Sequence, residues 1–313
     1  MSVALALALC VADRAHAFDG SISTEVSYGN RTWSANLIGD WGIVPDRLYL
    51  VATYGVVRYQ PEESWRSQPS HLVGLGLDVL PSSHWMLSLT GTFSPKATDT
   101  ETFGPNGGLT LAHTRRNVHG LLAAGYQSAG LRDVEWGVDA SLLVGWYELV
   151  RVAELPNRTF SETSDLVAVK PALGATLIVL DANEFGLRGS YTGYTKDPLQ
   201  RPQLPQALLD NPLFAARAQR LGQADATAAF FSAPVWFDVR VSYLRRFGPK
   251  VTGRLAYTYI QYVPSQGNAH ALSTRWAWKV TGWLRLWVGL TVQLDVPAGL
   301  SGYGTLGGEL ATE

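Results

Sequence analysis

The stretch that decides the fold is Asp133 to Tyr147, DVEWGVDASLLVGWY. Its even positions carry only apolar side chains, with Trp136 near one end and Trp146 near the other. Its odd positions include Asp, Glu, Gly and Ser. Successive side chains of a β-strand leave opposite faces of the sheet. The stretch therefore predicts a strand with one apolar face and one polar face.

The same alternation recurs along the chain from about Ser21 onward, for example in 85–93, 235–243, 272–284 and 286–294. The strands expected from it have about ten residues or more, whereas strands of soluble sheets usually have about five or six. A tilted membrane-spanning strand needs about 9 to 11 residues. Aromatic residues stand on these apolar faces, many near their ends, as they would in the interfacial girdles of a membrane barrel: Trp85, Phe93, Trp136, Trp146, Tyr257 and Tyr259.

Short and long connections alternate along the chain. Short turns are expected at 42–46, 81–84, 128–132, 181–184, 247–250 and around Arg285. Longer polar stretches rich in Pro and Gly lie at 60–70, 95–108, 152–163, 196–232 and 264–269. Barrels of bacterial outer membranes have short periplasmic turns and long external loops, so we assign the two sets accordingly.

Counting outward from the short turns gives twelve strands. They are expected near 32–41, 47–59, 71–80, 84–94, 110–127, 132–150, 165–180, 184–195, 233–246, 250–262, 270–284 and 286–296. One further strand at each end, Ser21 to Tyr28 and Gly299 to Thr312, would return both termini to the periplasm. The sequence thus predicts an all-β, closed antiparallel transmembrane β-barrel of about 14 strands, with 12 strands as the alternative.

Residues 1–17 have an apolar core followed by Ala15-His16-Ala17, the small-x-small pattern of a cleaved secretory signal peptide. A short buried helix is the alternative. No Lys or Arg precedes the apolar run, which leaves open a start upstream of Met1. Residues 18–313 form the predicted barrel domain. Its long loop at 196–232 is rich in Ala, Leu, Gln and Arg, which predicts a short helix that either narrows the pore or caps it.

Composition excludes two classes of protein. Hydrophobic residues make up 46 % of the chain, but the mean hydropathy is only +0.02 because they are interleaved with polar ones. No run after residue 20 approaches the roughly 18 apolar residues of a spanning helix, which excludes a helical membrane protein. The net charge of -1 offers no basic face for phosphates, so no nucleic-acid partner is expected.

The polar faces of the predicted strands carry charges of both signs. One interpretation is a charged constriction that orients solutes in the lumen; the other is a network of paired charges lining a narrow hydrated interior. The candidate lumen residues are the acids Asp78, Asp133, Glu135, Asp139, Asp238 and Asp295 and the bases Arg115, Lys170, Arg188, Arg240, Arg254, Arg275 and Lys279.

A search for catalytic chemistry finds little. Nucleophilic catalysis would need a Ser activated by a His; His113 and His119 share a predicted face, and Ser141 lies on the neighbouring strand. No Gly-x-Ser-x-Gly elbow occurs in the sequence. The histidines are scattered, so no metal site and no cofactor is expected. Cys10, the only cysteine, falls within the predicted signal peptide, which leaves no disulfide framework in the barrel.

These strands, girdles and loops resemble those of bacterial outer-membrane β-barrel proteins. Fourteen-stranded members of that superfamily include monomeric porins and long-chain fatty-acid transporters, so the resemblance implies a channel or passive transporter. The resemblance also implies outer-membrane lipids and the barrel-assembly machinery as partners. Many members end on a terminal Phe or Tyr, whereas this chain ends Gly-Glu-Leu-Ala-Thr-Glu, so the closing signal is expected near Tyr303 or of another kind.

We therefore expect an outer-membrane channel or passive transporter for small solutes, exported through the inner membrane by its signal peptide. The alternative is a non-conducting structural or binding barrel that displays its extracellular loops. An outer-membrane hydrolase is the least favoured hypothesis, and we expect no enzyme activity.

Overall fold

The computed structural model describes residues 20–29, 32–59, 66–103, 109–128, 130, 133–155, 157–198, 234–263, 267–296 and 299–311. Within these ranges the secondary-structure elements are all β-strands. No helix long and apolar enough to cross a membrane occurs in them. The strands are β1 (Gly20–Gly29), β2 (Thr32–Val44), β3 (Leu48–Tyr59), β4 (Arg66–Ser67), β5 (Ser70–Ser82), β6 (Trp85–Phe103), β7 (Leu109–Gln127), β8 (Val134–Leu155), β9 (Arg158–Val179), β10 (Asn183–Tyr191), β11 (Gly193–Tyr194), β12 (Val235–Arg246), β13 (Val251–Tyr262), β14 (Asn268–Lys279), β15 (Leu284–Val296) and β16 (Gly299–Ala311).

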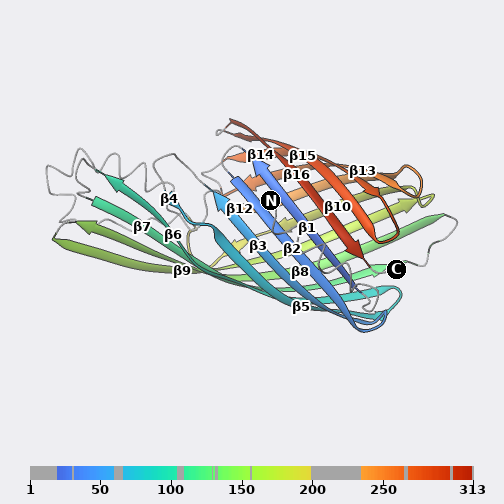
Figure 1. Cartoon of the computed structure of the whole chain (residues 1–313), viewed down its shortest axis with the longest axis horizontal. Helices are drawn as coiled ribbons and strands as arrows, with labels where there is room; N and C mark the ends of the chain where they lie inside the picture. The colour runs from blue at the N-terminus through green and yellow to red at the C-terminus, as the bar shows by residue number, and fades with distance from the viewer. Residues whose placement is uncertain are drawn as a thin grey trace.

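The strands close into a barrel (Figure 1). β1 pairs with β16 from Ser21 opposite Ala311 to Gly29 opposite Tyr303, and β10 pairs with both β9 and β12. β4 and β11 have two residues each and add only short pairings to β6 and β9. The other fourteen strands form a ring of antiparallel neighbours. The prediction of fourteen strands is confirmed, and the alternative of twelve is wrong.

The outer face of the ring is apolar and exposed. Leu75 is 62 % exposed, Leu89 58 % and Leu173 70 %, and register partners continue the belt around the sheet, for example from Leu77 through Leu89 to Leu122. A contiguous apolar surface of this extent is not stable in water and marks a membrane or an interface. Alternation along each strand then turns the polar positions toward the interior.

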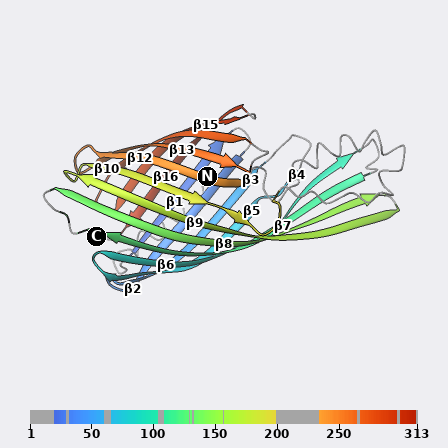
Figure 2. The same ribbon diagram turned by 180° about the vertical axis from the view of Figure 1, so that it is seen from behind.

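Four strands, β6 to β9, continue well beyond the rim of the barrel, as Figures 1 and 2 show from opposite sides. β6 and β7 have 19 residues each, and β8 and β9 have 22 each. The prediction of loops at 95–108 and 152–163 is therefore wrong over most of those stretches. Their polar composition is typical of loops, but a strand that has left the membrane needs no apolar side chains facing lipid. We call this part the β6–β9 extension.

The short connections lie at the opposite end of the barrel, where Asp46, Asp133 and Asp181 have positive φ angles. Aspartate tolerates this left-handed conformation better than most residues. Two details of the sequence interpretation are corrected here. The turn between β14 and β15 lies at 280–283, so Arg285 belongs to β15, and Asp133 lies in a turn and not on the lumen wall.

Two further expectations fall outside the described residues. The predicted signal peptide, 1–17, lies entirely outside them, and so does the predicted loop helix from residue 199 to 232. The described residues 196–198 of that loop are not helical.

The outward position of Leu89 gives a test of the membrane-facing belt. Leu89→Arg places a charge in the apolar belt, so we expect the unfolding free energy in phospholipid vesicles to fall by about 2 to 4 kcal/mol. Urea titration followed by tryptophan fluorescence measures it. Ser88→Arg, one residue away and opposite Asp78 on the inner face, is the matched control and should cost far less. Equal costs at both positions would contradict the assignment of faces.

Candidate functional site: the inner wall of the barrel

The strand register places twelve of the thirteen charged candidates on the inner face of the sheet. The remaining one, Asp133, lies in the turn before β8. The twelve on the inner face are Asp78, Arg115, Glu135, Asp139, Lys170, Arg188, Asp238, Arg240, Arg254, Arg275, Lys279 and Asp295.

On the wall made by β8 to β12, opposite charges lie in pairs. Lys170 Nζ lies 2.8 Å from a carboxylate oxygen of Asp238, and Ser190 donates a hydrogen bond to the same carboxylate. Arg188 Nη1 lies 3.4 Å from Asp139 and its Nη2 donates to Ser141 Oγ at 2.9 Å. The side chains of Arg188 and Asp139 are 51 % and 42 % exposed, so these pairs line a wall that is open to water.

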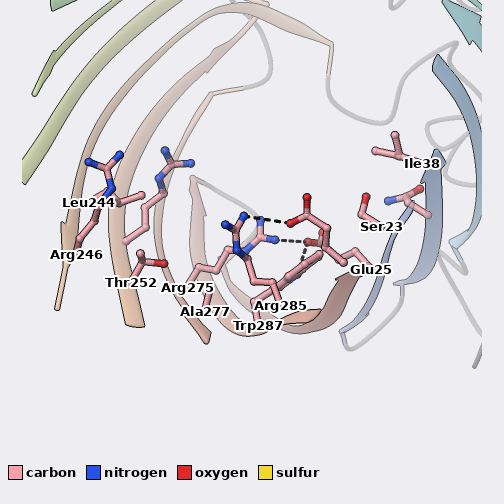
Figure 3. A pocket seen from close by; sticks show the side chains of 13 residues that line it. Ser23, Glu25, Ile38, Leu244, Arg246, Thr252, Arg275, Ala277, Arg285 and Trp287 are labelled. Carbon is pink, nitrogen blue, oxygen red and sulfur yellow. Dashed lines mark hydrogen bonds and ion pairs between the residues drawn. The ribbon is translucent and has the colours of Figure 1, made fainter. Parts of the chain in front are cut away.

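A recess of about 570 Å³ lies between the inner faces of β12 to β16, β1 and β2 (Figure 3). At its centre Glu25 accepts a hydrogen bond from the indole Nε1 of Trp287 at 3.0 Å. Arg275 Nη2 lies 3.6 Å from the same carboxylate, and the guanidinium carbon lies 4.3 Å from the centre of the Trp287 ring. A cation over an indole face is attracted by the ring quadrupole. Arg275 is thus held by both a carboxylate and a ring.

The other arginines of this recess also have acidic neighbours. Glu184 lies 3.2 Å from Arg254 and 3.7 Å from Arg246. Arg285 lies 3.1 Å from Glu309. The five groups come from β10, β12, β13, β15 and β16, which, with β14, follow one another in the sheet. Pairing of β16 with β1 then brings Glu25 to the same wall.

A second recess of about 320 Å³ adjoins the first and shares Glu25, Arg254 and Arg275 with it. It adds Arg240 from β12, which lies opposite Arg188 in the register of β10 and β12. Among the described residues, Arg240 is within ion-pair distance of no carboxylate. We call the two recesses together the arginine recess.

The sequence interpretation missed part of this recess. Glu25, Glu184, Arg246, Arg285, Trp287 and Glu309 were not among the candidates. Trp287 lies an even number of residues from Thr291 and Gln293 on the same strand, so it points to the same, inner face. This alternation is the signal that could have identified it. Glu25 lies in a strand whose polar face is mostly serine, so its sequence context gave little signal.

The aromatic candidates all lie on the outer face of the sheet. Trp85 and Trp136 both contact Tyr126 near the short-turn end, with ring centres 5.1 and 5.4 Å apart. Phe93 and Trp146 share one register row near the base of the β6–β9 extension.

Two further aromatic candidates lie on β13. Tyr257 and Tyr259 lie along this strand, and Tyr257 hydrogen bonds to His270 at 2.7 Å. Directly beyond Trp146 the outer face becomes charged, with Arg116 2.9 Å from Glu148. This change marks the edge of the apolar belt.

The residues considered for hydrolysis do not form a catalytic pair. His119 contacts the hydroxyl of Thr92 at 3.3 Å, and its ring lies tilted against that of Tyr147, with ring centres 5.0 Å apart. Ser141 accepts its hydrogen bond from Arg188. In the register, His119 lies opposite Gly145, four residues along β8 from Ser141.

Comparison with known proteins shows similarity in fold but none in sequence family. No protein-family model matches the chain, and no curated protein matches it in sequence. Among solved structures, the CymD monoaromatic hydrocarbon channel is 9 % identical, with a TM-score of 0.54 over 95 % of this chain and 88 % of that one. The toluene transporter TbuX of Ralstonia pickettii is 9 % identical, with a TM-score of 0.54 over 94 % and 90 %. The fold is thus that of outer-membrane β-barrel channels.

Trp287 leaves no space at Gly307, its register partner on β16. A Cβ at Gly307 would overlap the indole ring, so Gly307→Ala must displace Trp287 from Glu25. We expect the unfolding free energy to fall by about 1 to 3 kcal/mol, as overpacking does. At Gly304 the nearest atom to an added Cβ is 4.0 Å away, so Gly304→Ala is the matched control. An equal loss of unfolding free energy in both variants would contradict the close packing of Trp287 against Gly307.

His113 lies in the β6–β9 extension, beyond the apolar belt, and is only 2 % exposed. Burial, together with Arg151 and Arg115, lowers the pKa of His113 to about 3. Between about pH 6.5 and pH 3 the unfolded chain binds a proton that the folded protein does not bind. Stability due to neutral His113 is therefore complete above pH 6.5 and falls as the pH drops.

We expect His113→Gln to flatten the fall in unfolding free energy between pH 6.5 and pH 4. Urea titrations at several pH values give the slope for each variant. His84→Gln, which keeps His113 in place, should retain the wild-type slope. An unchanged slope in His113→Gln would show that His113 titrates alike in both states.

Proposed function

We propose that the protein is a bacterial outer-membrane channel for passive passage of small polar solutes. The observation that carries the proposal is the sorting of side chains across one closed sheet. Exposed leucine, valine and aromatic residues cover the outside, while charged recesses of about 570 and 320 Å³ open on the inside. An apolar exterior suits lipid, and a charged interior suits water and dissolved polar molecules.

Residues 1–17 fit this proposal as the segment that directs export through the inner membrane. The barrel would then be inserted by the assembly machinery of the outer membrane and surrounded by its lipids. The short turns would face the periplasm, and the β6–β9 extension would project outside the cell.

The solute class proposed here differs from that named for the two structural neighbours. CymD and TbuX are described as a monoaromatic hydrocarbon channel and a toluene transporter. Hydrocarbons carry no charge and no hydrogen-bonding group, so they form neither ion pairs nor hydrogen bonds with guanidinium or carboxylate groups. The five arginines of the arginine recess favour solutes that carry charge or strong hydrogen-bonding groups instead.

A second function is favoured by the β6–β9 extension. Four strands that leave the membrane offer a surface for binding a partner outside the cell, and a barrel with that role need not conduct. Solute flux at background level from correctly folded protein would support this binding role over the channel.

Refolded protein in planar lipid bilayers tests the channel directly. We expect stepwise, discrete conductance increases in KCl, because the recesses open into a hydrated interior. A heat-modifiable band on gels identifies correctly folded protein, and detergent without protein is the control. A folded barrel that gives no conductance steps would contradict the proposal.

A further inference from the structure

Charge is unevenly distributed over the inner wall. The arginine recess presents the guanidinium groups of Arg240, Arg246, Arg254, Arg275 and Arg285. The carboxylates that line it or pair with its arginines are Glu25, Glu184 and Glu309. Five cations against three anions leave this wall positive. By contrast, Lys170 and Arg188 on the neighbouring strands each have their own aspartate.

The excess is concentrated in the smaller recess. There Arg240, Arg254 and Arg275 face one lining carboxylate, that of Glu25. Arg254 also pairs with Glu184 from outside the recess, and Arg275 is held by Glu25 and the Trp287 ring.

Arg240 is exposed and has no carboxylate partner among the described residues. Its register neighbour is another arginine, Arg188. Two cations opposite each other on adjacent strands repel. A third, anionic group between them would relieve that repulsion.

We propose that the smaller recess binds the carboxylate of a small organic acid and makes the channel anion-selective. This inference rests on the proposed channel function and names its solute class. Arg240 supplies the free guanidinium, whose planar fork matches a carboxylate with two parallel hydrogen bonds. Arg254 and Arg275 supply fixed positive charge beside it, since their own partners hold them in place.

The rest of the recess fits the body of such an acid. Ile260, Ala271 and Tyr303 line it together with the hydroxyls of Thr258, Ser273 and Thr291. Its volume of about 320 Å³ lies at the lower end of the range of about 300 to 1,000 Å³ for small-molecule sites. A one-ring or short-chain acid is the size expected.

Bilayer recordings in a KCl gradient, with benzoate, benzamide and benzylammonium as probes, test the proposal. For wild type we expect the reversal potential to lie close to the equilibrium potential of chloride. We also expect benzoate to block the current. The neutral and cationic analogues of the same shape should not block. Equal block by all three probes, or a reversal potential shifted toward that of potassium, would overturn the proposal.

Arg240 variants locate the site. Arg240→Gln should weaken block by benzoate about tenfold or more, as expected for loss of a charge-assisted hydrogen bond. Arg240→Lys keeps the charge and should retain chloride preference while losing part of the benzoate affinity. Arg115→Gln is the matched control, because Arg115 lies in the β6–β9 extension, away from the recess, and 3.5 Å from Asp99. It should leave block unchanged. Equal benzoate block in wild type and Arg240→Gln would place the site elsewhere.

The two proposals fail in different ways. A barrel that conducts with no anion preference leaves the channel intact and overturns only this inference. For a barrel that does not conduct, isothermal titration of benzoate into detergent-solubilised protein still tests the site. Binding that is lost in Arg240→Gln and kept in Arg115→Gln supports the recess; no binding to wild type overturns it.

Discussion

The structure depends on one constraint: a backbone that crosses hydrocarbon must have every N–H and C=O paired within the protein. An open sheet leaves two edges unpaired, and each unpaired group in lipid costs several kcal/mol. Pairing of β1 with β16 removes both edges. The first and last strands of the described barrel therefore have to meet, although nearly the whole chain separates them.

Closure also decides where side chains go. Because side chains alternate along every strand, a closed ring has one face toward lipid and one toward a shared interior. The interior gathers residues from distant parts of the sequence, as the hydrogen bond between Trp287 and Glu25 shows across 262 positions. Most of its charges are held by opposite charges at 2.8 to 3.7 Å. The arginine recess departs from that balance, which is why it is the candidate site.

The barrel was predictable because alternation and turn chemistry are local properties of a sequence. Asp133 to Tyr147 shows its two faces without reference to any partner. Even β16, Gly-rich and weakly apolar, was predictable from the need to return the chain to the short-turn end. The β6–β9 extension was not, since strands in water lose the apolar face that identifies them. Continued pairing, such as Thr110 opposite Glu154, holds them instead.

The candidate site was predictable only in part, for a different reason. Strand phase places Arg240, Arg254 and Arg275 inside. Which of them pairs with a carboxylate depends on the register between strands, and a single strand does not reveal it. Glu25 and Trp287 therefore gained their role only from the neighbours that closure gives them.

Amide hydrogen exchange of the folded protein in lipid vesicles tests closure most directly. If β1 and β16 form the seam, their amides should be protected to the same degree as those of β8 and β9 in the middle of the sheet. Exchange of β1 and β16 as fast as that of unpaired amides, with β8 and β9 still protected, would show an open sheet and contradict the account.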